Sequence, residues 1–252
     1  MQGRLGIMLL KDLNYHVDLA NTNFLGNPHL ISAHASPHFH TLQFYIDVFG
    51  QYMSLTFSDC MSIDFFSYDS LVRPADLLLA DHPEYQTHYF SDHILISHPP
   101  DDEGITTFFL SFQYMELSIA CRQLETELLD QLPNQYTLKI NKVQTVSRQN
   151  LDTLRQEIEP YFTFPITSYF WYDTLDTLTL SFSHTPRPLT LSLAHCQKLI
   201  FRRRNHAHQS FNLSETYYTK ENCSYACLHI ENQEFSLSCC FQQLTLGELV
   251  TS

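Results

Sequence analysis

Two pairs of histidines have the spacing that chemistry at a site would use. His38 and His40 are two positions apart, and so are His206 and His208. Residues two apart on a β-strand project from the same face, so each pair would present two imidazoles side by side. Imidazole is the commonest side-chain metal ligand, but a chain with fourteen histidines contains such pairs by composition alone. We therefore predict no bound metal and no cofactor.

The loop around the first histidine pair is the best candidate for ligand binding. It follows an apolar segment, and two later apolar runs end in the same way at polar residues. Open α/β sheets bind ligands at the carboxyl ends of their strands, so residues at these ends would lie near one another. The predicted ligand-binding set is Ser36, His38, His40, Asp81 and Ser97.

The only basic cluster of the sequence is Arg202, Arg203 and Arg204. Guanidinium groups bind phosphates and carboxylates through paired hydrogen bonds. On a strand, Arg203 would face opposite to its two neighbours, which divides the cluster between two faces. We predict a contact with an anion or a partner protein here.

The net charge argues against general binding of nucleic acid. The chain carries 14 Lys and Arg against 27 Asp and Glu, a formal charge of −13, whereas nucleic-acid binding needs a basic surface. Residues 1–138 hold four basic and seventeen acidic residues, so the whole imbalance lies there. The remainder is neutral, which leaves room for a local anionic partner.

No catalytic motif is present. The sequence has no GxSxG, P-loop or GxGxxG pattern, and its six glycines form no phosphate-binding loop. The acidic run 101–103 is predicted to open a helix rather than to bind a cation, since carboxylates favour helix N-termini.

The compartment is predicted to be the cytoplasm. The apolar patch 5–10 is interrupted by Lys11 and Asp12 and does not read as a signal peptide. No apolar run approaches the ~20 residues that a membrane span needs. Seven cysteines, an odd number without a CxxC motif, indicate reduced and mostly buried thiols.

The elements of the first half follow an α/β rhythm. Short apolar runs at 28–36, 62–70, 75–83 and 92–100 predict buried strands, as in a parallel sheet covered on both faces. Residues 42, 45, 48, 49, 52 and 55 are apolar at helical spacing, and so are 117, 121, 124, 128 and 132. We predict helices there and an acidic α/β domain over residues 1–134.

The second half, residues 135–252, is predicted to be a β-rich domain with one helix. The helix is expected at 148–159, after Ser147 as its cap. The segments after it alternate between apolar and polar residues, the pattern of an antiparallel sheet with one wet face. The predicted fold class is therefore α+β or α/β, with an N-terminal α/β sheet domain followed by a mostly antiparallel domain.

The predicted order strand, helix, strand, strand, strand over residues 28–106 resembles the enzyme IIB-like domain of transcriptional regulators of the Mga and PRD type. The resemblance rests on "HLISAHAS", "FYIDVFGQYMSLTF", "SIDFFSYDS", "ADLLLADHP" and "DHILISHPPDDEGI". Enzyme IIB proteins of this type carry a phosphorylated cysteine where this chain has Ala33, His34 and Ala35. The resemblance thus implies a regulatory version without catalysis. The effector domain of LysR-type regulators has nearly the same pattern.

A second resemblance concerns the histidines. The pair at 38 and 40, with His88 and "VRPADLLLADHPEYQTH", resembles the cupin barrels of AraC-type regulators, in which a small β-barrel binds a ligand or metal. Ala75 stands where that family usually has glycine, and Gln43 is the nearest polar group after His40.

These observations support two hypotheses about function. The first is a non-enzymatic cytoplasmic regulatory or interaction protein. Its acidic domain would bind a small-molecule effector or a protein partner, its β-rich domain would mediate association, and homo-oligomers would be possible. The alternative is a metal-dependent cupin-like enzyme or a small hydrolase that uses the histidine-rich first half. A structural interaction protein is a third class.

Overall fold

The computed structural model describes the following residues, to which all statements below refer: 29–48, 51–67, 86–90, 93–97, 104–112, 115–132, 136–147, 149–172, 174–185, 187–203, 210–218, 223–231 and 234–251. Within them the chain is almost entirely β-strand. The strands are β1 (His29–Ala35), β2 (Thr41–Val48), β3 (Gln51–Ser58), β4 (Ser62–Ser67), β5 (Gln86–Phe90), β6 (His93–Ser97), β7 (Thr106–Phe112), β8 (Met115–Cys121), β9 (Gln123–Leu129), β10 (Tyr136–Thr145), β11 (Ile166–Tyr172), β12 (Thr174–Phe182), β13 (Leu189–Ala194), β14 (Lys198–Arg203), β15 (Ser210–Tyr218), β16 (Cys223–Glu231), β17 (Phe235–Phe241) and β18 (Gln243–Thr251). One helix, α3 (Leu151–Ile158), continues into a 3-10 turn, η1 (Glu159–Thr163).

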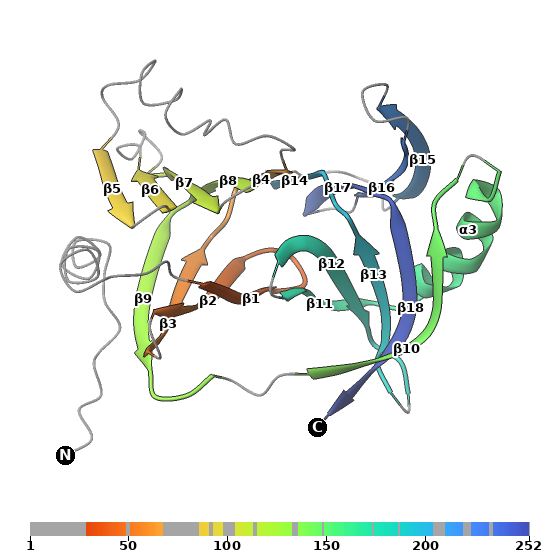
Figure 1. The fold of residues 1–252 in the computed structure, drawn as a ribbon, viewed down its shortest axis with the longest axis horizontal. Helices are drawn as coiled ribbons and strands as arrows, with labels where there is room; N and C mark the ends of the chain where they lie inside the picture. Colours follow the sequence, from red (N-terminus) through yellow and green to blue (C-terminus); the bar gives the residue numbers. More distant parts are fainter. Residues whose placement is uncertain are drawn as a thin grey trace.

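The strands form two nine-stranded antiparallel sheets. Sheet A has the order β10-β18-β13-β12-β11-β1-β2-β3-β9, and sheet B has the order β15-β16-β17-β14-β4-β8-β7-β6-β5. Figure 1 shows sheet B edge-on above sheet A, with α3 beside β10 and β15 at one side. The buried apolar side chains of both sheets form one cluster between them, so the protein is a β-sandwich.

The predicted α/β architecture of the first half is wrong. The helix predicted from Leu42 to Leu55 is the hairpin of β2 and β3, in which Val48 pairs with Gln51. Along β2, Leu42, Phe44 and Ile46 are buried and the residues between them are not. This is alternation with period two, and the helical spacing arose from aromatic residues on the outer face.

The helix predicted over 113–132 is also wrong, because the segment is β8 and β9. Strand β8 ends in sheet B at Cys121, and β9 begins in sheet A at Gln123. The corner between them shifts the buried positions from 117, 119 and 121 to 124 and 126. One such shift turns alternation into a spacing of three and four that mimics a helix.

The strands predicted for the second half coincide with β10 to β17, β18 was not predicted, and α3 lies within the predicted helix. The sheets draw strands from both sides of residue 134: β1 pairs with β11 in sheet A, and β4 pairs with β14 in sheet B. No helix in the described part of the chain is long and apolar enough to cross a membrane.

The two halves of the chain repeat one another. In sheet A, β2 pairs Leu42 with Ala35 on one side and with Phe57 on the other. Strand β12 pairs Leu178 with Trp171 and with Leu193, each 136 positions later. The same offset carries β1, β2, β3 and β4 onto β11, β12, β13 and β14 with unchanged register. Between residues 29 and 67, six residues are identical to those 136 positions later: Ser32 and Ser168, Thr41 and Thr177, Leu42 and Leu178, Leu55 and Leu191, Cys60 and Cys196, Phe65 and Phe201.

The next strands repeat as well, at an offset of 120. Strand β8 pairs Leu117 with Phe65 and Leu110, and β17 pairs Leu237 with Phe201 and Ile230. The backbone hydrogen bonds at the corners after β8 and β17 show the same correspondence. The N–H of Arg122 donates to the carbonyl of Ser58 at 3.2 Å, and that of Gln242 donates to the carbonyl of Ala194 at 3.1 Å. Strands β7, β8 and β9 thus correspond to β16, β17 and β18.

A pseudo-two-fold axis relates the repeats. In sheet A it passes between His34 and Phe170, which pair with each other and are equivalent by the offset of 136. In sheet B it passes between Asp64 and Ile200, which pair in the same way. Each sheet therefore contains strands of both repeats, and the two sets of strands pair edge to edge at the axis.

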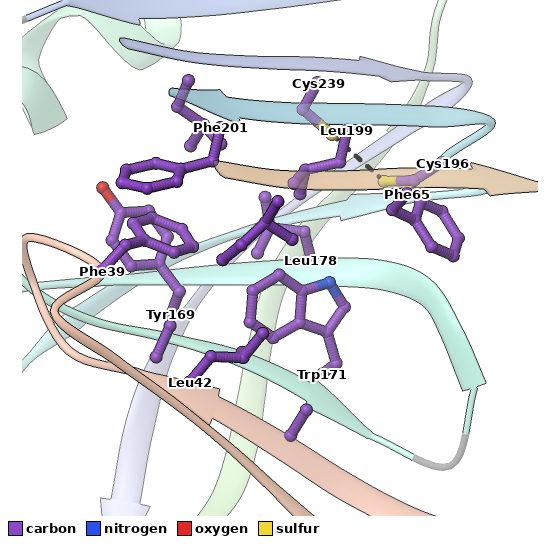
Figure 2. Packing of buried hydrophobic residues seen from close by; sticks show 14 of the residues in the cluster. Phe39, Leu42, Phe65, Tyr169, Trp171, Leu178, Cys196, Leu199, Phe201 and Cys239 are labelled. Carbon is purple, nitrogen blue, oxygen red and sulfur yellow. Dashed lines mark hydrogen bonds between the residues drawn. The ribbon is translucent and has the colours of Figure 1, made fainter. Parts of the chain in front are cut away.

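Packing at the axis sets small side chains against large ones. Ala33 lies opposite Trp171, and Ala35 lies opposite Tyr169. Each of these four residues is at most 6% exposed. Figure 2 shows Trp171 and Tyr169 between the sheets, below Leu199 and Phe201. A cavity of about 10 Å³ beside Ala33 is lined by apolar residues of both sheets. That volume is near the minimum for one water molecule and is too small for an organic ligand.

The repeat predicts matched effects of equivalent core substitutions. Leu42→Ala and Leu178→Ala each remove a side chain that is at most 2% exposed, so each should lower the free energy of unfolding by about 2–5 kcal/mol. Urea unfolding followed by the fluorescence of the single tryptophan, buried Trp171, measures this. Ile140→Ala, at 59% exposure, is the control and should change it by less than about 0.5 kcal/mol. A costly change at one leucine and a neutral one at the other would contradict equivalent packing.

His34 makes the sandwich sensitive to acid. Burial lowers the pKa of this histidine, which packs against Phe170 at a ring distance of 5.0 Å. As the pH falls through the ordinary histidine pKa of ~6.5, the unfolded chain takes up a proton before the folded chain does, so stability is lost. His34→Phe should reduce the loss in urea midpoint between about pH 8 and about pH 5. An unchanged loss would show that His34 makes no contribution.

Candidate functional site

Five polar side chains from four parts of the chain meet at one end of the sandwich. We call them the loop cluster: His38, His40, Asp59, Arg203 and Glu234. Two predicted groups come together here, because Nη2 of Arg203 lies 2.7 Å from Nδ1 of His40, 163 residues away in sequence. A guanidinium can only donate, so Nδ1 of His40 accepts this hydrogen bond and does not carry a proton.

The remaining contacts of the loop cluster link basic and acidic groups. Nδ1 of His38 lies 2.8 Å from Oε2 of Glu234, with both side chains about half exposed at 50% and 53%. The rings of His38 and His40 are 6.0 Å apart. Nη1 of Arg203 lies 4.0 Å from Oδ1 of Asp59. In the loop cluster the three charged groups, Glu234, Arg203 and Asp59, thus each face an imidazole or an opposite charge.

A buried phenylalanine holds the two histidines in place. Phe39 is fully buried, stacks on Phe201 at a ring distance of 4.5 Å and packs at a tilt against Tyr169 at 4.4 Å. Its φ of 51° is in the left-handed region, which is an outlier for a bulky side chain. Figure 2 shows Phe39 beside Tyr169 and Phe201. The turn places Phe39 in the core, while His38 and His40 remain exposed on either side of it.

Backbone hydrogen bonds fix the turn and the neighbouring corner. The carbonyl of Ser36 accepts a hydrogen bond from the N–H of Phe39 at 2.9 Å, and the Oγ of Ser36 accepts one from the N–H of Thr41 at 3.1 Å. The N–H of Asp59 donates to the carbonyl of His40 at 2.7 Å. Asp59 is also left-handed, with φ of 54°, a conformation that Asp tolerates better than most residues.

The other predicted site residues lie elsewhere. Arg202 faces away from the loop cluster and binds Asp64, with Nη2 at 2.7 Å from Oδ1 and 2.9 Å from Oδ2. The predicted division of the arginine cluster between two faces is therefore present. Ser97 ends β6, which β7, β8 and β4 separate from β14 in sheet B, so it is not part of the loop cluster. Asp81 and Arg204 lie outside the described residues.

The second repeat contains a counterpart of the loop cluster with its residue types exchanged. Asp176 is equivalent to His40, and His195 is equivalent to Asp59. Nδ1 of His195 lies 3.6 Å from Oδ2 of Asp176. Like Asp59, His195 is left-handed, with φ of 55°. This pair has no equivalent of Arg203, because Ser67 takes that position.

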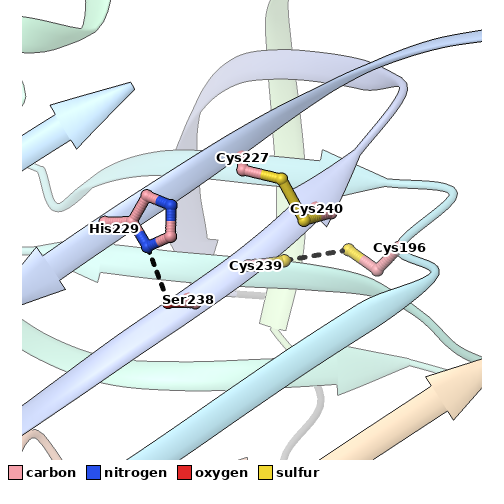
Figure 3. The surroundings of a disulfide bond; sticks show 6 residues. All are labelled: Cys196, Cys227, His229, Ser238, Cys239 and Cys240. Carbon is pink, nitrogen blue, oxygen red and sulfur yellow. Dashed lines mark hydrogen bonds between the residues drawn. A yellow bond between two sulfur atoms is a disulfide. The ribbon is translucent and has the colours of Figure 1, made fainter. Parts of the chain in front are cut away.

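The six cysteines whose side chains the structure describes divide into four buried thiols and one disulfide. Burial raises the pKa of Cys121 to about 12 and that of Cys60 further, so both thiols stay protonated. Cys196 and Cys239 are also buried, with sulfurs 3.4 Å apart. The prediction of reduced thiols was wrong for Cys227 and Cys240, which form a disulfide (Figure 3). The described residues contain no group of three or more His, Cys, Asp or Glu side chains suited to a metal ion.

Sequence reasoning missed Phe39, Asp59 and Glu234. The signal for Asp59 was the pair "DC" at 59–60 and "HC" at 195–196, each after a run of alternating apolar residues. That spacing marks the two equivalent corners. Glu234 comes from the turn between β16 and β17, and only the packing of that turn against the loop of β1 and β2 brings it near His38.

Comparison of the chain with protein-family models, with curated proteins and with solved structures finds no match. The interpretation of the loop cluster therefore rests on its own geometry.

Phe39 should matter for stability far more than the polar side chains it positions. Phe39→Ala should lower the free energy of unfolding by about 3–5 kcal/mol, because it empties a fully buried aromatic site. His38→Ala and Arg203→Ala should each change it by less than about 1 kcal/mol, since their partners are solvent-exposed. Urea unfolding followed by Trp171 fluorescence compares the three variants. Comparable losses for all three would mean that the polar contacts, and not Phe39, hold the turn.

Proposed function

We propose that this chain is a non-enzymatic binding protein with a regulatory role, and that it recognises a protein partner through the loop cluster. The observation that carries the proposal is Phe39. A bulky residue is kept in the left-handed region, fully buried, between two exposed histidines. Unfavourable backbone conformations of this kind concentrate at functional sites, where they hold side chains in a set geometry.

The surface suits a macromolecule better than a small effector. Asp59 and Glu234 are 56% and 53% exposed, and Arg203 is 31% exposed, so the charged groups stand at the surface and not in a pocket. Charges of both signs at fixed positions give specificity towards a partner with complementary charges. Arginine is also enriched among the residues that dominate binding energy at interfaces.

We propose a cytoplasmic location for this activity. Four buried thiols, those of Cys60, Cys121, Cys196 and Cys239, support it, because unpaired cysteines are common in reducing compartments. The disulfide between Cys227 and Cys240 is the exception, and it would then depend on the redox conditions around the protein.

The proposal predicts that partner capture depends on the loop cluster and not on its counterpart. The full chain is immobilised and its binding proteins are quantified by mass spectrometry. His40→Ala/Arg203→Ala should lower capture of a specific partner about tenfold or more, because a binding hot spot contributes about 2 kcal/mol or more. Direct titration of that partner should show the same loss.

The chain supplies the matched control for this experiment. Asp176→Ala/His195→Ala removes the second repeat's counterpart of His40 and Asp59, two side chains that are also solvent-accessible, at 36% and 60% exposure. This variant should capture the partner as the unchanged protein does. Equal capture by all three proteins, or equal loss from both variants, would refute recognition through the loop cluster.

A further inference from the structure

The disulfide lies on the hairpin that completes the loop cluster. Cys227 on β16 and Cys240 on β17 are directly opposed in the strand register, with Cα atoms 4.1 Å apart. The turn of the same hairpin carries Glu234, the partner of His38. Next to it, Phe235 is buried against Phe39 at a ring distance of 6.0 Å. One covalent bond therefore joins the two strands whose turn forms one side of the cluster, near the end of the hairpin away from that turn.

The first repeat shows that the hairpin does not need this bond to form. The positions equivalent to Cys227 and Cys240 are Thr107 and Ala120, which pair between β7 and β8 in the same register without a covalent link. The strand pairing is thus encoded in both repeats, and the disulfide is an addition to the second. Its removal should loosen the hairpin without changing the fold.

The position of the bond limits which sulfurs can react. Adjacent residues of a strand face opposite sides of the sheet, so Cys240 lies on the outer face while Cys239 points into the core beside Cys196 (Figure 3). Cys239 is held protonated, because its contact with Cys196 and its burial raise its pKa. Since a thiolate is the attacking species in exchange, Cys239 does not attack the disulfide.

Only β15 lies between β16 and the edge of sheet B. Strands at a sheet edge open locally at lower free energy than central ones. Ser214 of β15 lies opposite Cys227 in the strand register, so opening of β15 would uncover that side of Cys227, which is 3% exposed in the closed state, while Cys240 is 8% exposed. A reductant can therefore reach the bond without global unfolding.

We propose that the Cys227–Cys240 disulfide is a reversible redox clamp that regulates the loop cluster, an inference that rests on the function proposed above. A dithiol reductant attacks one sulfur, the S–S bond breaks, and a mixed disulfide forms. The second thiol of the reductant then displaces the protein sulfur. Two electrons and two protons pass to Cys227 and Cys240, which become thiols, and the reductant closes to a cyclic disulfide. Oxidation by a small disulfide compound reverses the exchange.

Reduction loosens the β16–β17 hairpin and with it the positions of Glu234 and Phe235. The bond closes a loop with a sequence separation of 13. In the chain-entropy model, releasing a loop of about this length shifts an opening equilibrium by about a hundredfold. Amide exchange in β17 should therefore rise by about tenfold or more on reduction. Exchange in β8, the equivalent strand of the first repeat, should not change.

Hydrogen exchange of the full native chain, with and without dithiothreitol, tests the clamp, and N-ethylmaleimide labelling reports which thiols are free. Labelling after native reduction should mark Cys227 and Cys240 and spare Cys196 and Cys239. Cys227→Ser/Cys240→Ser should show the fast β17 exchange of the reduced protein and no response to dithiothreitol. Unchanged β17 exchange in both cases, or a bond that dithiothreitol cleaves only in denaturant, would overturn the proposal.

Partner capture is then compared with and without dithiothreitol. The unchanged protein should lose about tenfold or more of its partner on reduction, and Cys227→Ser/Cys240→Ser should show the low level throughout. Equal capture in both states would overturn regulation of the loop cluster. Exchange in β17 is measured without any partner, so the clamp and the proposed function can fail separately.

Discussion

The pairing of small against large side chains at the pseudo-two-fold axis is the contact on which the sandwich depends. Ala33 and Ala35 of β1 lie opposite Trp171 and Tyr169 of β11. An aromatic residue at all four positions would not fit between sheets about 10 Å apart, and an alanine at all four would leave a cavity. The repeats have therefore diverged so that each large side chain faces a small one. Both sheets are continuous through this centre, and neither repeat closes its core alone.

The loop cluster depends on the same core. Phe39 extends the aromatic packing around Tyr169 and Phe201, so the turn that carries His38 and His40 is anchored to residues of the second repeat. This anchoring favours the left-handed conformation that the turn requires. Because buried packing fixes the turn, the positions of the exposed polar groups do not depend on the weak contacts among them. Surface ion pairs of this kind contribute little to stability and remain available for recognition.

Strict alternation in the second half allowed its strands except β18 to be predicted from the sequence, whereas the corners between strands of the first half led to wrong predictions. The shift at Cys121 and the aromatic outer face of β2 both imitate helical spacing, and only pairing with distant strands decides between the two periods. His38, His40 and Arg203 could be selected by residue type. Their proximity in the fold could not be predicted, because His40 and Arg203 are 163 residues apart in the sequence. The repeat was hidden because six identical pairs over β1 to β4 are too few to stand out. It is the strand register that reveals it.

Positions at which the repeats differ on the surface are the places to look for function. Core positions such as Leu42 and Leu178 keep their residue type because the two halves bury them in equivalent surroundings. The corner pairs instead exchange acid and imidazole, and Arg203 is added on one side only. The disulfide likewise replaces an ordinary pair of Thr107 and Ala120. None of these differences is required by a fold that the other repeat attains without them. A requirement outside the fold, such as recognition of a partner and its control, is the simplest reason for these differences.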